Sequence, residues 1–243
     1  RLMSNYNKEQ QSAITYPAKP LLIIAGAGTG KTTIAYQIAK KLWKNKSPHP
    51  KTLFLVDRKN LLNQAMVNNF SNFGEARHRI RRKSETAYEM YFALYQGLDV
   101  DKEESIVSAI KKVVTDCGRL DVLVNNAGYG QFGCTEDVSV DDFRKQFETN
   151  FFSIVRIIQE VSPIMRNQNS GIIVNISSVV GKIGLPGSPA YISSKFALEG
   201  LSECLRYELG QFGIKTTLIE PGVTKTNFYN SMKIPESKTD PKY

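Results

Sequence analysis

Short apolar runs alternate with longer amphipathic stretches along most of the chain. Unbroken runs of about four to eight apolar residues are typical of buried parallel strands, and apolar residues that recur every three or four positions are typical of helices. Strands are expected at 21–25, 51–56, 91–98, 120–124, 171–176 and 215–219. Helices are expected at 7–15, 33–43, 60–70, 105–114, 140–161 and 193–212. The alternation predicts an α/β fold, a doubly wound, Rossmann-like parallel sheet with helices on both faces.

Three stretches are less regular. Residues 71–86 are polar and strongly basic, and are predicted to form a loop or a mobile insertion. The stretch 91–98 suits either a strand or a helix, and its aromatic content favours a strand. The tail from Lys233 is rich in lysine and proline and is expected to be poorly ordered.

Polar or turn-forming residues stand just after four of the predicted strands. They are Asp57, Asn126, Ser178 and Pro221. In parallel sheets ligands bind beyond the carboxyl ends of the strands. We therefore expect these residues to line one crevice.

A glycine-rich turn joins the first predicted strand to the helix behind it. It runs from Ala25 to Thr32, and its other notable residues are Gly26, Gly28, Gly30 and Lys31. Glycines let backbone N–H groups approach an anion, and the following helix adds its positive N-terminal end. Lys31 can reach β- and γ-phosphates, and Thr32 can ligate magnesium. The turn is therefore predicted to bind phosphate.

This region resembles the Walker A loop of helicase-like nucleoside triphosphatases. Residues 7–11 and 21–32 are similar to the start of a superfamily-one DNA helicase. Residues 52–58 and 91–96 look like the motor subunit of type I restriction enzymes. The resemblance covers about residues 1–97 and implies ATP with magnesium. An ATP motor also needs an apolar strand ending in Asp-Glu, and no such pair occurs in the chain, so hydrolysis is expected to be slow or absent.

A tyrosine and a lysine stand four residues apart in the second half of the chain. If a helix begins near Ala190, Tyr191 and Lys195 lie on one face of it. A nearby cation lowers the pKa of a phenol by favouring the phenolate. Such a tyrosine can exchange a proton with a carbinol oxygen while hydride moves to a nicotinamide.

These residues belong to a series of spaced motifs. Taken together, the motifs resemble the short-chain dehydrogenase/reductase family from about Leu98 to about Phe228. The series consists of Leu98-Asp99-Val100, Asp121 to Gly128, Asn150-Phe151, Asn175 to Ser178, Tyr191 with Lys195, and Pro221 to Thr226.

The resemblance implies a role for each motif. Tyr191 would be the general acid/base, Lys195 would lower its pKa and hold the nicotinamide ribose, Ser178 would orient the substrate carbonyl, and Asn150 would belong to the proton relay. The implied contacts with NAD or NADP include Asp99 at the adenine, Asn126 with Ala127 and Gly128 along the cleft, and Thr226 at the carboxamide, with Pro221 and Gly222 beside it.

The glycine turn departs from the family pattern. Gly26 and Gly30 keep the register of the family's cofactor loop, but Ala25 replaces its threonine and Thr32 its last glycine. That glycine allows close approach to a pyrophosphate, so Thr32 is expected to crowd a dinucleotide and to impair activity.

The end of the second predicted strand bears on the choice of dinucleotide. Asp57 stands near the usual place of an acid that binds a ribose 2′-hydroxyl, whereas Arg58 beside it could accept a 2′-phosphate. The sequence therefore does not decide between NAD and NADP.

Charge divides the chain near residue 97. The net charge is +9, and residues 1–97 hold 16 basic and 5 acidic residues, against 16 and 18 in the rest. The basic run 77–83 would suit a polyanion, but it lacks interleaved aromatic residues, so nucleic-acid binding is not expected. We hypothesise a phosphate-loop-like β-α-β half at 1–97 and a dehydrogenase-like half at 98–243 that complete one sheet. The rival is a fusion of two fragments.

Cysteine content and hydropathy bear on the expected class of protein and on its cellular location. Cys117, Cys134 and Cys204 are odd in number and lack metal-ligand spacing, which excludes a disulfide scaffold and favours a reducing, cytoplasmic location. The longest apolar runs are too short to span a bilayer. No metal site is expected beyond the magnesium that the ATP alternative would require.

The first interpretation is therefore an NAD(P)-dependent oxidoreductase of the short-chain type acting on a small alcohol or carbonyl. By the same resemblance it would be a homo-oligomer. The alternative is an ATP-binding protein, or a remnant of a DNA-associated motor, with little or no dehydrogenase activity.

Overall fold

The computed structural model describes residues 101–222 and 233–234, together with the backbone of four strands at 21–25, 52–56, 77–79 and 90–94. The strands are β1 (Leu21–Ala25), β2 (Thr52–Val56), β3 (Arg77–Arg79), β4 (Met90–Leu94), β5 (Val122–Asn125), β6 (Gly171–Ile176) and β7 (Ile214–Ile219). The α-helices are α4 (Glu103–Cys117), α5 (Val140–Phe147), α6 (Ser153–Asn167) and α7 (Pro189–Gly210). A π-helical segment, η4 (Glu148–Phe152), joins α5 to α6, and a 3₁₀ turn, η5 (Val179–Gly181), follows β6.

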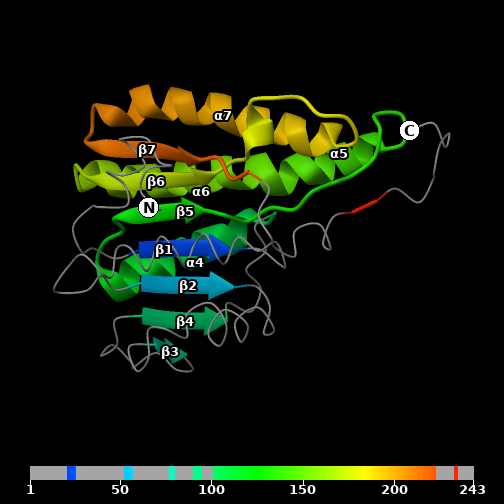
Figure 1. Ribbon diagram of the computed structural model, residues 1–243. Coiled ribbons are helices and arrows are strands. Elements are labelled where there is room, and N and C mark those ends of the chain that lie inside the picture. Colours follow the sequence, from blue (N-terminus) through cyan, green and yellow to red (C-terminus); the bar gives the residue numbers. More distant parts are fainter. Residues whose placement is uncertain are drawn as a thin grey trace, which may run out of the picture.

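All seven strands are parallel neighbours in one sheet, in the order β3-β4-β2-β1-β5-β6-β7 (Figure 1). The chain moves outward from β1 and then returns to pair β5 with the other side of β1. This change of direction is the topological switch point where ligands bind in open α/β sheets. The sheet takes strands from both sides of residue 97, and the division there into two halves stays a prediction.

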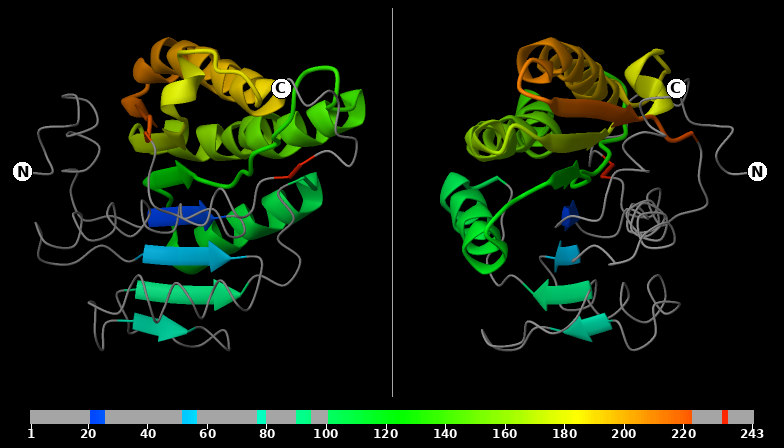
Figure 2. Two further views of the ribbon diagram at one scale, coloured as in Figure 1. Left: turned by 45° about the vertical axis from the view of Figure 1, so that its right-hand side comes forward. Right: turned by 90° about the vertical axis from the view of Figure 1, so that its left-hand side faces the viewer.

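Three described helices share one hydrophobic core with the sheet (Figure 2). α4 packs against α6, and α7 packs against β7 and η4. Buried side chains from these helices meet the apolar residues of β5, β6 and β7, for example Ile110, Val161 and Leu198 over Leu123 and Ile173. This packing fixes the start of α7, and with it the predicted catalytic residues, relative to the strand ends.

Local signals explain where several helices begin and end. The hydroxyl of Ser139 accepts a hydrogen bond from the N–H of Asp142 at the start of α5. α4 ends at Gly118, which has φ +73° and donates its N–H to the carbonyl of Val114. Gly213 closes the turn into β7 at φ +70°, where a side chain would meet the carbonyl oxygen of Asn169 at 2.8 Å.

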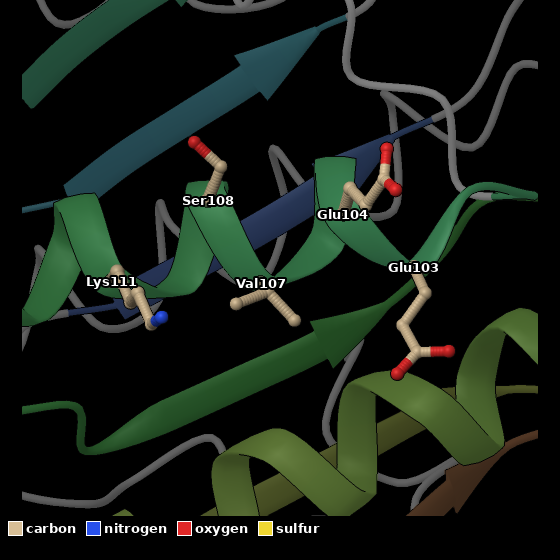
Figure 3. A pocket seen from close by; sticks show the side chains of 5 residues that line it. All are labelled: Glu103, Glu104, Val107, Ser108 and Lys111. Carbon is tan, nitrogen blue, oxygen red and sulfur yellow. The ribbon is translucent and has the colours of Figure 1, made fainter.

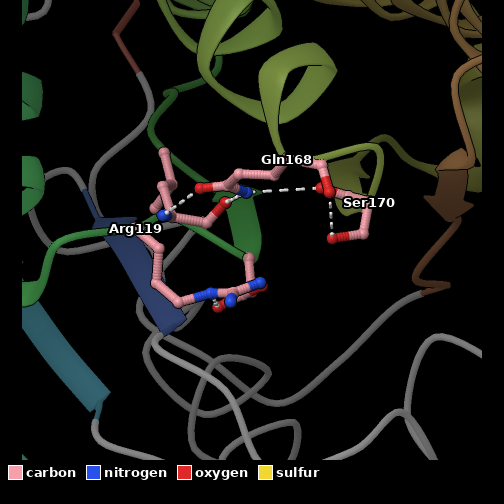
Figure 4. Close-up of polar contacts among 5 residues, drawn as sticks. Arg119, Gln168 and Ser170 are labelled. Carbon is pink, nitrogen blue, oxygen red and sulfur yellow. Dashed lines mark hydrogen bonds and ion pairs between the residues drawn. The ribbon is translucent and has the colours of Figure 1, made fainter.

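A polar brace ties the end of α6 to the start of β5 (Figure 4). The amide of Gln168 accepts from the N–H of Leu120 at 2.9 Å and donates to its carbonyl at 2.8 Å. Arg119 makes two bonds, of 2.8 and 2.6 Å, to the buried carboxylate of Asp121. The brace lies at the amino ends of the strands, opposite the predicted crevice.

The predicted class of fold is confirmed. The strand expected at 171–176 is β6, and those at 21–25, 51–56 and 215–219 agree with β1, β2 and β7 to within one residue. The stretch 91–98 contains most of β4, so the preference for a strand was right. The helices expected at 7–15, 33–43 and 60–70 lie outside the described residues.

Two expectations were wrong. Residues 77–79 of the expected loop form β3, which pairs with β4. A short edge strand pairs on one side only and tolerates charged residues, so a basic segment without apolar alternation can form one. The single helix expected at 140–161 is divided into α5, η4 and α6, because the helical hydrogen bonding loosens into a π turn at 148–152.

Among the described helices, none combines the length and the apolar character that crossing a membrane requires.

Candidate active site

Tyr191 and Lys195 lie one turn apart on the first half of α7. Pro189 occupies the first turn of this helix, where its fixed φ favours helix initiation. The ammonium nitrogen of Lys195 lies 5.8 Å from the centre of the Tyr191 ring. Tyr191 is 9% exposed and Lys195 is 0% exposed. The structure therefore brings the predicted acid/base and its cation together, with the lysine behind the tyrosine.

Burial controls the charge of Lys195. Its Nζ donates a 2.8 Å hydrogen bond to the carbonyl of Ile176, the last residue of β6. Loss of solvation lowers the pKa of Lys195 to about 8, and the negative charge of Glu199 one turn further along α7 acts in the opposite direction. At neutral pH the ammonium stays largely protonated, so it favours the phenolate of Tyr191.

Ser178 stands where β6 ends and η5 begins. Its hydroxyl accepts from the N–H of Val180 at 3.4 Å and donates to the carbonyl of Pro221 at 3.5 Å. Both distances lie at or beyond the long end of the normal range. The hydroxyl is thus held loosely and can turn toward a substrate oxygen.

Asn150 lies in the π turn and is fully buried. Its amide accepts from the N–H of Tyr129 at 3.1 Å and donates to the Tyr129 carbonyl at 3.0 Å. The same amide lies 3.2 Å from the hydroxyl of Ser194, the residue before Lys195. Single π turns are frequent at functional sites, and this one turns an amide toward both the loop after β5 and α7.

The sequence reasoning missed Gln146. This fully buried glutamine, one turn before Asn150, donates a 2.9 Å hydrogen bond to the carbonyl of Tyr129. The two amides together clamp the backbone of Tyr129. Their four-residue spacing on an expected helix was a usable signal, because residues four apart share a face.

Tyr129 itself is half-buried, and burial, with smaller effects from Asp101 and Asp142, raises its pKa to about 12. The Nζ of Lys233 lies 4.5 Å from the centre of its ring, which suits a cation–π contact. Tyr129 therefore stays protonated at physiological pH and acts as a fixed part of the loop after β5.

The predicted cofactor side is described at the ends of β5 and β7. Asn126, Ala127 and Gly128 follow β5, and all three are buried. Within the part of the chain that the structure describes, neither amide atom of Asn126 has a hydrogen-bond partner. A buried amide without partners is costly unless a ligand completes it, so the Asn126 amide suits a polar ligand at the end of β5.

At the end of β7, the carbonyl of Pro221 accepts from the N–H of Val179 at 3.2 Å. Gly222 follows with open space beside its Cα. The remaining predicted cofactor residues lie outside the described part of the chain: Gly26, Gly28, Gly30, Lys31, Thr32, Asp57, Arg58, Asp99 and Thr226.

A surface hollow of about 660 Å³ lies on α4 (Figure 3). It is lined by Glu103, Glu104, Val107, Ser108 and Lys111. Among the described residues of the predicted site, none lines it. Within the described ranges, no group of three His, Cys, Asp or Glu side chains is placed to hold a metal ion.

The parallel sheet and the polar residues at its strand ends define a Rossmann-type α/β protein. The sequence profile described as short chain dehydrogenase matches residues 22–236. The chain belongs to the short-chain dehydrogenase family. Because the match begins in β1, it includes the glycine turn, and the comparisons give no support to the helicase-like interpretation of that turn.

Several relatives are named oxidoreductases. The uncharacterized oxidoreductase YusZ of Bacillus subtilis is 47% identical over 135 residues, which is 56% of this chain and 48% of that protein. The 3-ketodihydrosphingosine reductase of Bacteroides thetaiotaomicron is 40% identical over 139 residues, covering 57% of this chain and 52% of that protein. The chain spans about half the length of the curated relatives it matches.

Solved structures agree with the fold. A short-chain dehydrogenase from Streptomyces avermitilis superposes with a TM-score of 0.71 at 30% identity, covering 93% of this chain and 73% of that one. NAD⁺-bound xylitol dehydrogenase gives 0.68 at 28% identity, with 85% and 71% covered. ElxO with NADP bound gives 0.67 at 28% identity, with 86% and 75% covered.

Proposed function

We propose that this chain is an NAD(P)-dependent oxidoreductase that interconverts an alcohol and a carbonyl compound, with Tyr191 as general acid/base. The observation that carries the proposal is the buried ammonium of Lys195, 5.8 Å from the centre of the Tyr191 ring. A lysine on an ordinary helix face stays in solvent, because burial penalises the charged form, whereas Lys195 is buried next to a phenol without a carboxylate bonded to it. The arrangement suits a group that must stabilise a phenolate.

In the direction of reduction, Tyr191 donates its phenolic proton to the carbonyl oxygen of the substrate. The nicotinamide, when bound, supplies the hydride to the carbonyl carbon, so the products are an alcohol and the oxidised dinucleotide. Lys195 stabilises the phenolate that remains, and the hydroxyl of Ser178 donates a hydrogen bond to the substrate oxygen. In the reverse direction the phenolate of Tyr191 accepts the proton of the alcohol.

The proton relay would pass along the residues around Lys195. Asn150 would hold its far end, since its amide reaches the Ser194 hydroxyl beside the lysine. Gln146 supports this role by fixing the Tyr129 carbonyl that Asn150 also contacts. These two amides are positioning residues, because they act through the loop and the helix.

Among the described residues, Asn126 is the best candidate to bind the dinucleotide, because its buried amide lacks a hydrogen-bond partner. Ala127, Gly128, Pro221 and Gly222 would form the adjoining walls. Gly26, Gly28, Gly30 and Lys31 would cradle the pyrophosphate, and Thr32 would crowd it. Asp99 would contact the adenine and Thr226 the carboxamide. Asp57 would bind a 2′-hydroxyl in NAD, and Arg58 a 2′-phosphate in NADP.

Assembly into a homo-oligomer is part of the proposal. Phe152 in η4 and Phe196 in α7 are each nearly half exposed, although large aromatic side chains favour burial. Size-exclusion chromatography with light scattering is expected to give a dimer or larger species. A Phe196→Glu variant is expected to shift it toward the monomer, and a wild-type monomer at micromolar concentration would contradict this part.

Cofactor binding tests the proposal. NADH, NADPH and ATP with magnesium are titrated separately, with nicotinamide fluorescence and thermal shift as the readouts. At least one nicotinamide dinucleotide is expected to bind and to stabilise the fold. Asn126→Leu is expected to weaken that binding about tenfold, whereas Asn167→Leu, at an exposed position on α6, serves as the matched control. Stabilisation by ATP alone would overturn the proposal.

A further inference from the structure

Large apolar side chains are exposed on three described segments: the loop after β5, the stretch from η5 to the start of α7, and residues 233–234. They are Phe132, then Val179, Ile183 and Leu185, and finally Ile234, with exposed fractions between 40 and 69%. Contiguous exposed apolar surface is uncommon on soluble proteins and usually marks a binding site. We therefore ask whether these segments lie together in space.

Backbone hydrogen bonds hold the three segments together. The N–H of Phe132 donates to the carbonyl of Lys233 at 2.8 Å, and the N–H of Lys233 donates to Gly130 at 2.9 Å. On the other side, the N–H of Gly133 donates to the carbonyl of Gly187 at 2.8 Å. The segments are distant in sequence but form one bonded unit.

Gly187 shows how closely this unit is packed. It has φ +82°, and a Cβ at this position would lie 3.2 Å from Cζ of the Phe132 ring. The ring of Phe132 thus rests on the backbone two residues after Leu185, while nearly half of its surface stays open to solvent. The open apolar surface of Phe132 therefore adjoins the loop that carries Ile183 and Leu185.

The stretch that carries Val179, Ile183 and Leu185 connects two of the proposed catalytic residues, Ser178 and Tyr191. Val179 directly follows Ser178, and α7 begins at Pro189, two residues before Tyr191. In Figure 1 the loop before α7 (yellow), the loop after β5 (green) and the 233–234 segment (red) lie on the side to which the strand arrows point. This is the edge where the proposed substrate must enter.

The charged side chains of these segments are engaged elsewhere. Lys182 forms an ion pair of 3.1 Å with Glu220. The ammonium of Lys233 lies against the Tyr129 ring. The unit therefore pairs its cations with protein groups and leaves its apolar side chains for a ligand.

We infer that residues 132, 179, 183, 185 and 234 form a hydrocarbon-binding wall at the mouth of the site, and that the substrate carries an extended apolar chain next to its hydroxyl or carbonyl group. This inference rests on the proposed function, because it takes Ser178 and Tyr191 as the reacting end. The apolar chain of the substrate would cover the wall while the oxygen meets these two residues.

A binding experiment tests the wall without turnover. Primary alcohols from butan-1-ol to decan-1-ol compete against the neutral dye N-phenyl-1-naphthylamine, with dye fluorescence as the readout. Affinity is expected to rise about three- to fourfold per methylene group. Leu185→Asp and Phe132→Ser are expected to flatten this dependence.

Val140→Asp is the matched control, because Val140 is an exposed aliphatic residue at the start of α5. Its chain-length dependence is expected to equal that of the wild type. Circular dichroism and melting temperature verify that each variant folds. A flat dependence in the folded wild type, or an equal loss in Val140→Asp, would overturn the inference.

Turnover separates this inference from the proposed function. With the preferred dinucleotide, kcat/KM for ketones from butan-2-one to decan-2-one is expected to rise with chain length, and Leu185→Asp is expected to reduce the gain. Tyr191→Phe is expected to lose turnover but keep the chain-length dependence of alcohol binding. Turnover without any chain-length dependence would contradict the inferred hydrocarbon-binding wall and leave the oxidoreductase assignment intact. Chain-length-dependent binding with unimpaired turnover in Tyr191→Phe overturns the mechanism alone.

Discussion

Lys195 donates a 2.8 Å hydrogen bond from Nζ to the carbonyl oxygen of Ile176, the last residue of β6. One side chain thus joins α7 to the strand that leads into Ser178. In the proposed mechanism the lysine has two roles, because its charge would favour the phenolate of Tyr191 and its bond fixes α7 against the strand end.

The buried ammonium makes stability depend on pH. Burial lowers the pKa of Lys195 to about 8 from an ordinary 10.5. Below pH 8 the group is charged in both the folded and unfolded chains, and its burial costs the fold about 3 kcal/mol. Between about pH 8 and 10.5 the folded chain has lost the proton while the unfolded chain keeps it, so this cost disappears as the pH rises.

Lys195→Met lacks the titrating group and serves as the reference. Urea unfolding from pH 7 to pH 10 is expected to show the free energy of unfolding of the wild type rising relative to that of the variant. The difference is expected to reach about 2 kcal/mol or more by pH 10. Parallel curves for the two proteins would show that Lys195 is not buried as a cation.

Glu199 is expected to keep Lys195 charged during catalysis. Its carboxylate raises the pKa of Lys195, although less strongly than burial lowers it. Glu199→Gln is therefore expected to move the alkaline limb of the kcat/KM profile to lower pH. At pH 8.5 the loss is expected to be about fivefold, equivalent to about 1 kcal/mol.

Glu203→Gln, one turn further along α7 and exposed, is the control for the Glu199 variant. An equal shift in both variants would indicate a general charge effect of the helix. An unchanged alkaline limb in Glu199→Gln would contradict the assigned role.

Substituting an amide that holds Tyr129 is expected to lower stability and activity more than substituting a surface amide. Asn150→Ala leaves the buried N–H of Tyr129 without its side-chain acceptor, which is expected to cost about 2 kcal/mol of stability. It also removes the amide that donates to the Ser194 hydroxyl, so kcat is expected to fall more than KM changes. Thermal unfolding and steady-state kinetics measure the two effects, with Gln211→Ala on the exposed end of α7 as the control. A stability loss with unchanged kcat would mean that Asn150 has a structural role only.

The brace at the opposite edge of the sheet is expected to affect stability alone. Gln168→Leu removes the hydrogen bonds to both backbone groups of Leu120. The free energy of unfolding is expected to fall by about 1 to 3 kcal/mol, while KM for the dinucleotide stays unchanged. A changed KM would show that the two edges of the sheet are coupled.

The sequence predicted the elements whose apolar pattern is continuous. β6 and β7 are buried parallel strands, so their residues stand out from the polar turns on either side. β3 did not stand out, because an edge strand of Arg77–Arg79 pairs through its backbone and carries no apolar pattern. The π turn at Glu148–Phe152 was hidden for a related reason, since the amphipathic period runs through it.

The site was predictable only in part. Tyr191 and Lys195 share a helix face, so their four-residue spacing was enough to place them together. The contact between Lys195 and Ile176, and the clamp of Gln146 on Tyr129, depend on how distant elements pack. No local pattern encodes such contacts, although the spacing of residues 146 and 150 gave a hint.

The central claim is that Tyr191 exchanges the proton during hydride transfer. Its most direct test is the single-turnover rate of carbonyl reduction in Tyr191→Phe, with Tyr207→Phe, an exposed tyrosine on the same helix, as the matched control. Tyr191→Phe is expected to lose at least about 100-fold in rate with dinucleotide binding unchanged, while Tyr207→Phe reacts like the wild type. A Tyr191→Phe rate within a few-fold of wild type would contradict the claim.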